Sequence, residues 1–419
     1  MDAHRAAEAA ARVSYGRLLA FLAAPSRDMT AAEDALCDAL RLALETWPLN
    51  GVPQNPDAWL LTTARRRLID KARHERVQSS ATEGLKLMVD NNETFGERLP
   101  DKRLELLFAC THPAIDPSVR TALMLQTVLG IDAARIASAF LVSAGTMGQR
   151  LVRAKTKIRD AGIAFEIPDR AELPARVESV LDAIYACYGM GWEITPAADA
   201  GNRDLVDEAM WLARLVVELL PQEPEAKGLL ALMLHCEARR PARRFNGRFV
   251  PLSEQDTRLW SRPMMVEAER LLSAAAPMRR VGRFQLEAAI QSAHAERARS
   301  GRVDWSAIEQ LYRGLVALAP SVGARLGQAA ALAETDGAAR ALALIDEISP
   351  ALVAAHQPYW ALRADLLRRL DRTAEAREAY ERSLGLTKDA AVREFLMAKC
   401  LPATQVTRAT VPARRRAPK

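Results

Sequence analysis

The stretch Ile131–Asp160 reads IDAARIASAFLVSAGTMGQRLVRAKTKIRD, and its apolar spacing predicts two helices joined by a tight turn. The first helix places Ile136 and Phe140 on one apolar side. The turn follows, and Ser143 stands where its hydroxyl group can cap the second helix. Two short helices of this kind predict a helix-turn-helix, which places its second helix in the major groove of DNA.

The second helix of this pair separates apolar from basic residues. Its apolar stripe, at helical spacing, consists of Met147, Leu151, Ala154 and Ile158. Its other faces carry cations, namely Arg150, Arg153, Lys155, Lys157 and Arg159. Thr146 and Gln149 lie near its start, where a recognition helix needs short polar groups to reach base edges. The pattern favours a DNA-reading helix over a surface helix with a solvated basic face.

Composition sets broad limits on the class of protein. The 419 residues are 49% hydrophobic and 26% charged, which predicts a globular chain of two or three domains. A net charge of +6 is mild, so a nucleic-acid site must come from local clustering of cations. The cysteines and histidines are scattered, so we expect no disulfide, metal site or cofactor. With no signal peptide and no apolar run of about 18 residues, we expect a soluble, cytoplasmic protein without a membrane segment.

Helical spacing extends through almost the whole chain, so we expect an all-α fold. The predicted order is a first helical domain over 1–76, a polar linker over 77–100, the helix-turn-helix domain over 101–165, a helical extension over 166–400 and a disordered basic tail over 401–419. We expect a chain that is cut after about Asp169 to remain folded, with altered function.

The extension contains a stretch that resembles a tetratricopeptide repeat. It reads YWALRADLLRRLDRTAEAREAYERSLGLT, and its residues at the aromatic and small positions of the repeat are Trp360, Ala364, Ala376, Tyr380 and Ser383. One repeat cannot bury its own apolar face, so we infer a stack of helical hairpins through the extension. The alternative is an ordinary helical domain with one chance match.

Two helices in the first domain carry opposite charges. The first, TAAEDALCDALRLALETWP, is acidic on one face, and we expect Thr30 to cap it with Glu33 in the capping-box position. After a loop over 48–54, the second helix, DAWLLTTARRRLIDKARHER, follows an Asn55 cap and Pro56. This second helix is strongly basic. Two basic helices in one chain, joined by a linker, are typical of a protein that contacts a nucleic acid at two sites.

The order of these segments resembles the extracytoplasmic-function sigma factors of bacterial RNA polymerase, in the subgroup with a C-terminal tetratricopeptide-like domain. The resemblance rests on the acidic helix, then PDAWLLTTARRRLIDKARHER, the linker, and IASAFLVSAGTMGQRLVRAKTKI. It continues through LLFACTHPAI, EAMWLARLVVELLPQEPEAKGLLALML and ALRADLLRRLDRTAEAREAY, and so covers nearly the whole chain. The chain departs from the family pattern at Ser143-Ala144-Gly145 and at AIYACYGMGWEIT.

The resemblance implies a sigma factor without catalytic activity, which binds core RNA polymerase and promoter DNA. The acidic residues implied to dock on polymerase are Glu33, Asp34 and Asp38, for which a solvated face is the alternative. Those implied to contact the minus-ten element are Asn50, Gln54, Arg65, Arg66 and Arg73. Those implied to contact the minus-thirty-five element are Ser143, Thr146, Gln149, Arg150, Arg153 and Lys157. We expect the extension to modulate the sigma domains through an intramolecular contact.

Three other classes of protein account for less of the sequence. A helix-turn-helix regulator with a repeat-domain sensor leaves the acidic helix and the basic helix of the first domain unused. A pure repeat scaffold leaves both basic helices unexplained. An enzyme is the weakest option, because the sequence has no Walker A motif, GxSxG, HExxH or carboxylate–histidine cluster.

Overall fold

The computed structural model describes residues 3–75, 102–140, 142–169, 171–192 and 200–400. The predicted linker over 77–100 and the predicted tail over 401–419 lie outside the described residues. The described residues are almost entirely helical and include one two-stranded hairpin, which confirms the all-α fold class. The chain divides into two compact units, Met1–Leu219 and Leu220–Lys419.

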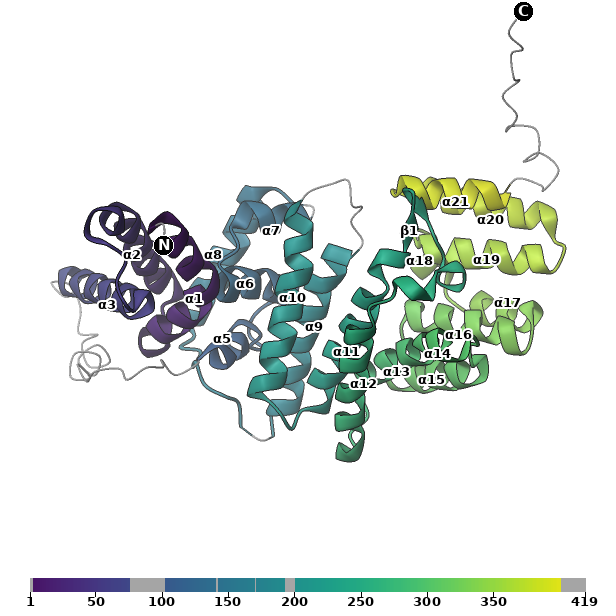
Figure 1. Cartoon of the computed structure of the whole chain (residues 1–419), viewed down its shortest axis with the longest axis horizontal. Coiled ribbons are helices and arrows are strands. Elements are labelled where there is room, and N and C mark those ends of the chain that lie inside the picture. The colour runs from purple at the N-terminus through teal and green to yellow at the C-terminus, as the bar shows by residue number, and fades with distance from the viewer. Residues whose placement is uncertain (1–2, 76–101, 141, 170, 193–199, 401–419) are drawn as a thin grey trace, which may run out of the picture. The chain divides into compact units, whose positions relative to one another are not determined.

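Three long helices begin the first unit, namely α1 (Ala3–Ser26), α2 (Met29–Asn50) and α3 (Pro56–Glu75) (Figure 1). Asp28 caps α2, since its Oδ1 accepts a hydrogen bond of 2.9 Å from the Ala31 N–H. The predicted Thr30 cap is therefore wrong, because Thr30 lies inside the first turn of the helix. The predicted start of α3 is confirmed, with the Asn55 side chain as cap and Pro56 as the first helical residue.

The loop expected over 48–54 is shorter than predicted. α2 continues through Pro48, which is exposed in its last turn, and ends at Asn50. Trp47, in the same turn, is buried, and its ring meets the Trp59 ring of α3 edge-on with centroids 5.5 Å apart. This aromatic contact fixes the end of α2 against the start of α3.

The remaining described helices of the first unit are α5 (Arg103–Cys110), α6 (Pro117–Leu129), α7 (Ala133–Ala139), α8 (Ala144–Asp160), α9 (Leu173–Trp192) and α10 (Ala200–Leu219). α1 packs against α5 and α6, and a Cβ on Gly16 of α1 would lie 2.0 Å from the Val128 carbonyl oxygen. α9 packs against α5, α6 and α10, and Arg176 of α9 donates a hydrogen bond to the carbonyl of buried Phe108. The first unit thus includes α9 and α10, which the predicted boundary at 165 assigns to the extension. The apolar spacing of a helix indicates that one of its faces packs against another element, but it does not indicate which element.

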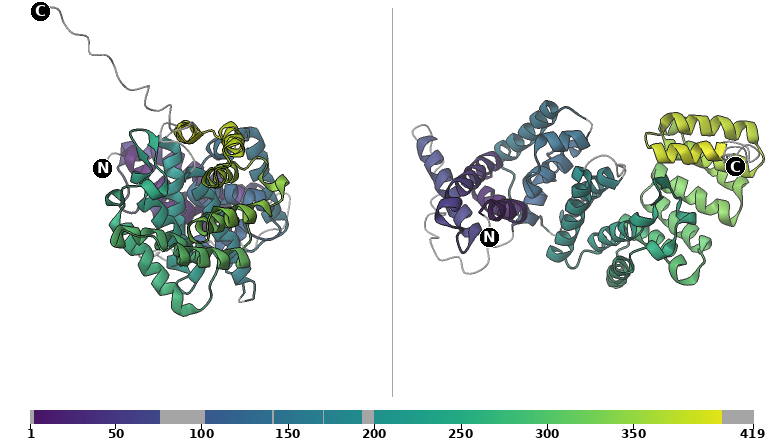
Figure 2. Two further views of the ribbon diagram at one scale, coloured as in Figure 1. Left: turned by 90° about the vertical axis from the view of Figure 1, so that its right-hand side faces the viewer. Right: turned by 45° about the horizontal axis from the view of Figure 1, so that its top comes forward.

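The second unit is a series of helices with one short hairpin. Its longer helices are α11 (Pro224–Ala238), α12 (Arg262–Ala275), α13 (Arg283–Ala295), α15 (Trp305–Leu318), α16 (Val322–Thr335), α17 (Ala338–Asp346), α19 (Gln357–Arg369), α20 (Thr373–Leu386) and α21 (Ala390–Cys400). The hairpin pairs β1 (Arg244–Phe245) with β2 (Arg248–Phe249), and β2 packs against α21. Consecutive helices lie side by side, teal through yellow in Figures 1 and 2.

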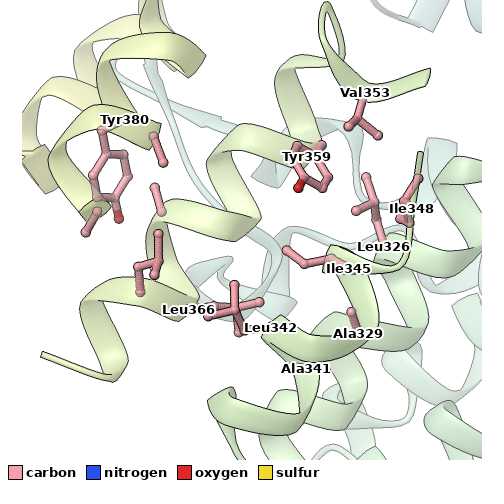
Figure 3. Packing of buried hydrophobic residues seen from close by; sticks show 14 of the residues in the cluster. Leu326, Ala329, Ala341, Leu342, Ile345, Ile348, Val353, Tyr359, Leu366 and Tyr380 are labelled. Carbon is pink, nitrogen blue, oxygen red and sulfur yellow. The ribbon is translucent and has the colours of Figure 1, made fainter. Parts of the chain in front are cut away.

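An apolar cluster joins α16, α17, α19 and α20 (Figure 3). Leu326, Ile345, Leu366 and Tyr380, one from each helix, are at most 7% exposed. The predicted repeat residues lie on α19 and α20. Trp360 is half-buried, and the other four are buried, namely Ala364, Ala376, Tyr380 and Ser383. Small side chains at two of these positions let the paired helices approach closely.

A carboxylate from another helix caps the N-terminus of α13. Glu225 of α11 accepts hydrogen bonds from the backbone N–H groups of Phe284 (2.8 Å) and Gln285 (3.1 Å). Gly228 permits this close crossing, because a Cβ there would lie 2.6 Å from the Gln285 nitrogen. One side chain thus satisfies two of the N–H groups that a helix N-terminus leaves without a partner.

We expect Glu225→Ala to lower the free energy of unfolding of the second unit by about 1–3 kcal/mol, because both N–H groups lose their acceptor. Denaturant unfolding followed by circular dichroism measures the change. Glu347→Ala is the control, since Glu347 is exposed in the same unit, and it should change stability by less than about 0.5 kcal/mol. Equal effects of the two substitutions would contradict the capping role of Glu225.

Candidate nucleic-acid interface

The two helices predicted within Ile131–Asp160 are present as α7 and α8. Ser143 caps α8, since its Oγ accepts a hydrogen bond of 3.1 Å from the Thr146 N–H. The predicted apolar stripe of α8 is confirmed, because its members are all buried: Met147, Leu151, Ala154 and Ile158. The helix is therefore fixed on one side by apolar packing and at its start by a side-chain cap.

The opposite side of α8 is exposed and polar. It carries the predicted DNA-reading residues Thr146, Gln149, Arg150, Arg153 and Lys157. The Arg153 Nε donates to the Gln149 carbonyl at 3.4 Å, a contact within the helix. Arg150 and Lys157 form no hydrogen bond or ion pair with other described residues. Neither cation is held by a hydrogen bond or ion pair in the described part of the chain, so both can meet an anionic partner such as a phosphate group.

Val152 is a residue of this exposed side that the sequence pattern did not single out. It is 62% exposed and follows Gln149 by three residues, so the two side chains share one face of α8. Exposed valine next to exposed glutamine offers an apolar contact beside a hydrogen-bonding group. In the major groove, an apolar side chain can contact the methyl group of thymine.

Lys155 differs from the other cations of α8. The sequence pattern places it on an outward face, but it is 7% exposed and forms an ion pair with Glu33 of α2. Lys155 follows Leu151 by four residues and precedes Ile158 by three, so it shares their buried side. That spacing can be read from the sequence, whereas a partner 122 residues away cannot.

The same ion pair encloses Glu33, which was predicted to bind polymerase. Its side chain is 15% exposed, and its Oε1 is buried without a hydrogen-bond partner in the described part of the chain. Burial raises the pKa of Glu33 above its ordinary value, and nearby Lys155 opposes that shift. A carboxylate enclosed in this way cannot dock on another protein while α2 and α8 remain packed together.

Asp34 and Asp38, the other two acidic residues predicted to bind polymerase, remain at the surface. The Asp34 carboxylate lies 3.4 Å from the Lys71 Nζ of α3, and both side chains are exposed. The Asp38 carboxylate lies 3.9 Å from the Arg41 Nε on the same helix. Exposed pairs of this kind contribute little to stability, so both carboxylates can exchange their partners for a basic surface.

The charges of the Glu33–Lys155 pair act on titratable groups of other helices. Burial raises the pKa of Tyr15 in α1, and the charge of Glu33 adds to this shift. Burial also raises the pKa of the Cys110 thiol in α5 to about 12, and its Sγ lies 3.2 Å from the Thr127 hydroxyl of α6. The ion pair is thus part of a buried polar centre to which α1, α2, α5, α6 and α8 contribute.

The basic residues of α3 divide between surface and interior. Arg66 and Arg67 are exposed, whereas Arg65 is half-buried with its guanidinium 4.8 Å from the centroid of the Phe21 ring of α1. Burial lowers the pKa of Arg65. Arg65, predicted to hold the DNA backbone, thus contacts α1, whereas Arg67, which is not among the predicted DNA contacts, is exposed. The side chain of Arg73 lies outside the described residues.

The two residues predicted to read a base of the minus-ten element are both exposed. Gln54 lies in the loop before α3, as expected, and Asn50 is instead the last residue of α2. Leu49, next to Asn50, is 83% exposed. A leucine so exposed at a helix end is a further candidate contact for an unstacked base, and the sequence pattern did not indicate it.

Comparisons with known proteins define the family of the chain. Residues 176–276 match a family of unknown function, DUF6596, and this match extends across the boundary between the two compact units. An uncharacterized protein of Rhizobium meliloti (strain 1021) is 37% identical over 378 residues, which are 88% of this chain and 89% of the relative. The chain therefore belongs to the same family as that protein. No solved structure gives a significant match.

Three further observations concern the chemistry that the described residues can support. None of their helices is long and apolar enough to cross a bilayer. They bring together no group of three or more His, Cys, Asp or Glu side chains that could hold a metal ion. None of the five cysteines, all of which lie in the described residues, forms a disulfide. The exposed polar and basic side chains of α3 and α8 are therefore the features from which we infer function.

Proposed function

We propose that this protein is an extracytoplasmic-function sigma factor with a tetratricopeptide-like extension. In this proposal α1–α3 form a region-2-like domain, α5–α8 form a region-4-like helix-turn-helix domain, and the helices from α9 onward form the extension. The observation that carries the proposal is α8, a capped helix with a buried apolar stripe and an exposed side that holds Gln149, Arg150 and Lys157. The packing of α9 on α5 and α6 supports an intramolecular contact between extension and DNA-binding domain.

The proposed DNA contacts divide by position along each helix. On α8, residues near the start read base edges of the minus-thirty-five element, and these are Thr146, Gln149 and Arg150 with Val152 beside them. Farther along α8, Arg153 and Lys157 bind phosphates. For the minus-ten element, Asn50 and Gln54 read an unstacked base that packs on Leu49, and Arg66 holds the backbone.

The packed arrangement of the first unit cannot contact both promoter elements at once. The minus-ten and minus-thirty-five elements lie about 25 base pairs apart, which is about 85 Å along the duplex. At about 1.5 Å per residue, the path from Asn50 to Glu33 along α2 is about 26 Å and that from Lys155 to Ser143 along α8 is about 18 Å. With about 10 Å between packed helix axes, the two sites are at most about 55 Å apart. We infer that α1–α3 separate from α5–α8 when the promoter binds.

The connection between the two domains is long enough for this separation. Residues 76–101 connect α3 to the helix-turn-helix domain, and at about 3.4 Å per residue such a segment spans at most about 90 Å. The contacts that must be broken are those of α2 with α8 and of α1 with α5 and α6. The Glu33–Lys155 ion pair therefore holds the proposed factor in a closed state.

Transcription reconstituted from purified components tests the proposed function. The full chain is added to core RNA polymerase and genomic DNA, and transcript starts are mapped. We expect starts at a limited set of promoters, and we expect the chain to co-purify with core polymerase without DNA. A helix-turn-helix regulator with a repeat-domain sensor would bind specific DNA but not core polymerase. Failure to support any promoter-dependent transcript, where another sigma factor succeeds, would refute the proposal.

The division of contacts on α8 gives a second test. Arg150→Ala should shift or relax preference within the minus-thirty-five element, with a loss of about 1–3 kcal/mol at one base pair, since a bidentate contact to a base edge is lost. Lys157→Ala should weaken binding to all sequences by a similar factor and flatten its salt dependence. Binding is measured on promoter variants at several salt concentrations. The reverse assignment of the two effects would show that α8 lies differently in the groove.

A further inference from the structure

A cavity of about 640 Å³ lies within the second unit. Its wall comes from segment 252–260 and from α13, α14 (Arg297–Ser300), α15, α16 and α19. Leu366 belongs both to this wall and to the apolar cluster of Figure 3. Ligand-binding pockets have volumes of about 300–1,000 Å³ and a mainly apolar lining with a few polar groups. The cavity has this size, and its polar lining falls into two groups.

The first group is aromatic and includes Trp260. This side chain is 5% exposed, and its Nε1–H is buried without a hydrogen-bond partner among the described residues. The Arg297 guanidinium lies 5.2 Å from the centroid of the Trp260 ring and donates hydrogen bonds to two backbone carbonyls. Arg297 therefore fixes the Trp260 ring at the wall of the cavity.

His294 and Trp305 complete the aromatic group. Their rings meet edge-on with centroids 5.5 Å apart. Burial, with the charges of Arg239 and Arg297, lowers the pKa of His294 to about 4, so the imidazole is neutral at pH 7. A neutral imidazole offers one N–H donor and one nitrogen acceptor. Neither the His294 ring nor the Trp305 ring forms a hydrogen bond with the described residues, so the ring nitrogens of both are available to a ligand.

The second group consists of charges that balance one another. Arg369 donates to the Glu334 carboxylate at 2.6 Å through Nη1 and to the Asp365 carboxylate at 2.7 Å through Nε. With Arg297, the wall holds two arginines and two carboxylates, so its net charge is zero. An ionic ligand would lose its hydration here without a net opposing charge to offset the loss.

We propose that this cavity binds a small planar aromatic molecule without net charge. Its ring packs against Trp260 and Trp305, because aromatic rings stabilise one another in offset and edge-to-face arrangements. A polar group on the ligand pairs with the free nitrogens of His294 and Trp305. This ligand site goes beyond the proposed function. Binding of a small molecule requires neither polymerase nor DNA, so the site can be tested even if the proposed function is wrong.

Isothermal titration calorimetry of the full chain with four indole probes tests this proposal. The probes share one planar ring and differ in charge: indole is uncharged, L-tryptophan is zwitterionic, tryptamine is cationic and indole-3-acetate is anionic. We expect indole or L-tryptophan to bind with a Kd below about 1 mM, at least about tenfold more tightly than either charged probe. Absence of binding by both of the first two, or tighter binding of a charged probe, would overturn the proposal.

Substitutions then locate the bound probe. Trp305→Leu keeps an apolar side chain but removes the ring, so we expect binding about 3- to 10-fold weaker. His294→Leu should weaken binding and His294→Gln should restore most of it, because glutamine keeps a donor and an acceptor. Trp211→Leu, in the first unit, is the matched control and should leave Kd unchanged.

A folding defect is separated from a binding defect by circular dichroism of each variant. If Trp305→Leu does not fold, Trp305→Phe replaces it, and it should weaken binding of L-tryptophan by about 2- to 10-fold, because phenylalanine keeps a ring but lacks the N–H donor. An equal loss of affinity in Trp211→Leu, or an unchanged affinity in both Trp305→Leu and His294→Leu, would place the probe elsewhere and overturn the assignment.

Discussion

A Lys155→Ala chain is expected to lose about 3–5 kcal/mol of unfolding free energy, because the substitution leaves the Glu33 carboxylate buried without its counter-ion. The Lys155 and Glu33 side chains are 7% and 15% exposed, so water cannot readily replace the missing ammonium group. The two residues come from α8 and α2, and the loss should therefore affect the contact between the two proposed DNA-binding domains. Urea unfolding followed by circular dichroism measures it.

Lys157→Ala is the matched control, since Lys157 lies two residues away on the exposed side of α8. It should change stability by less than about 0.5 kcal/mol. The double substitution Glu33→Leu with Lys155→Met should recover most of the loss, because apolar residues of similar size remove the need for a paired charge. If Lys155→Ala behaves like Lys157→Ala, the pair does not hold α2 to α8.

The proposed closed state predicts a functional effect of the same pair. Lys155→Glu sets two carboxylates against each other and should favour separation of the domains, seen as a larger radius of gyration and stronger promoter binding with core polymerase. The exchanged pair Glu33→Lys with Lys155→Glu should restore the closed state. Weaker promoter binding by a folded Lys155→Glu chain would contradict the idea that this contact opposes DNA binding.

Truncation of the chain should have the second large effect on stability. A chain that ends at Leu219 should fold, whereas one that ends at Asp169 should lose most of its tertiary stability. The shorter chain lacks α9 and α10, which uncovers parts of α5 and α6 and removes the Arg176 donor from the Phe108 carbonyl. Each leucine-sized side chain exposed costs about 1.5–3 kcal/mol. A few such losses equal the whole stability of a domain, about 5–15 kcal/mol.

This expectation reverses the one drawn from the sequence, in which a chain cut after about Asp169 remains folded. Thermal unfolding and limited proteolysis of the two truncated chains at equal concentration distinguish the two outcomes. We expect a cooperative transition for the chain ending at Leu219 and a broad transition, with rapid proteolysis, for the shorter one. The same midpoint in both chains would show that α9 and α10 do not stabilise α5 and α6.

The features predicted correctly depend on residues within about three helical turns of one another. The Ser143 and Asn55 caps and the stripe from Met147 to Ile158 are of this kind, because capping and helical periodicity are local interactions. The predicted N-terminal cap of α2 was wrong because two nearby residues can both cap a helix. Asp28 and Thr30 are both good caps two residues apart, and only the observed backbone decides between them.

The candidate DNA contacts divide in the same way. The exposed side of α8 follows from the position of its buried stripe, and its five predicted polar residues all lie there. The roles of Glu33 and Arg65 could not be predicted, because each side chain contacts a different helix, α8 in one case and α1 in the other. A charged residue at the edge of an apolar stripe can face solvent or a distant partner, and the sequence pattern is the same for both.

The sequence by itself determined the all-α class, the positions of most helices and the separation of apolar from polar sides on α8, because short-range periodicity controls each of these. Only the tertiary structure decided that Lys155 meets Glu33, that α9 and α10 belong to the first unit, and that Trp260, His294 and Trp305 line one cavity. These features join residues far apart in the chain. Their existence depends on which apolar faces cover one another and on whether a buried charge or N–H group finds a partner, and both are properties of the packed chain as a whole.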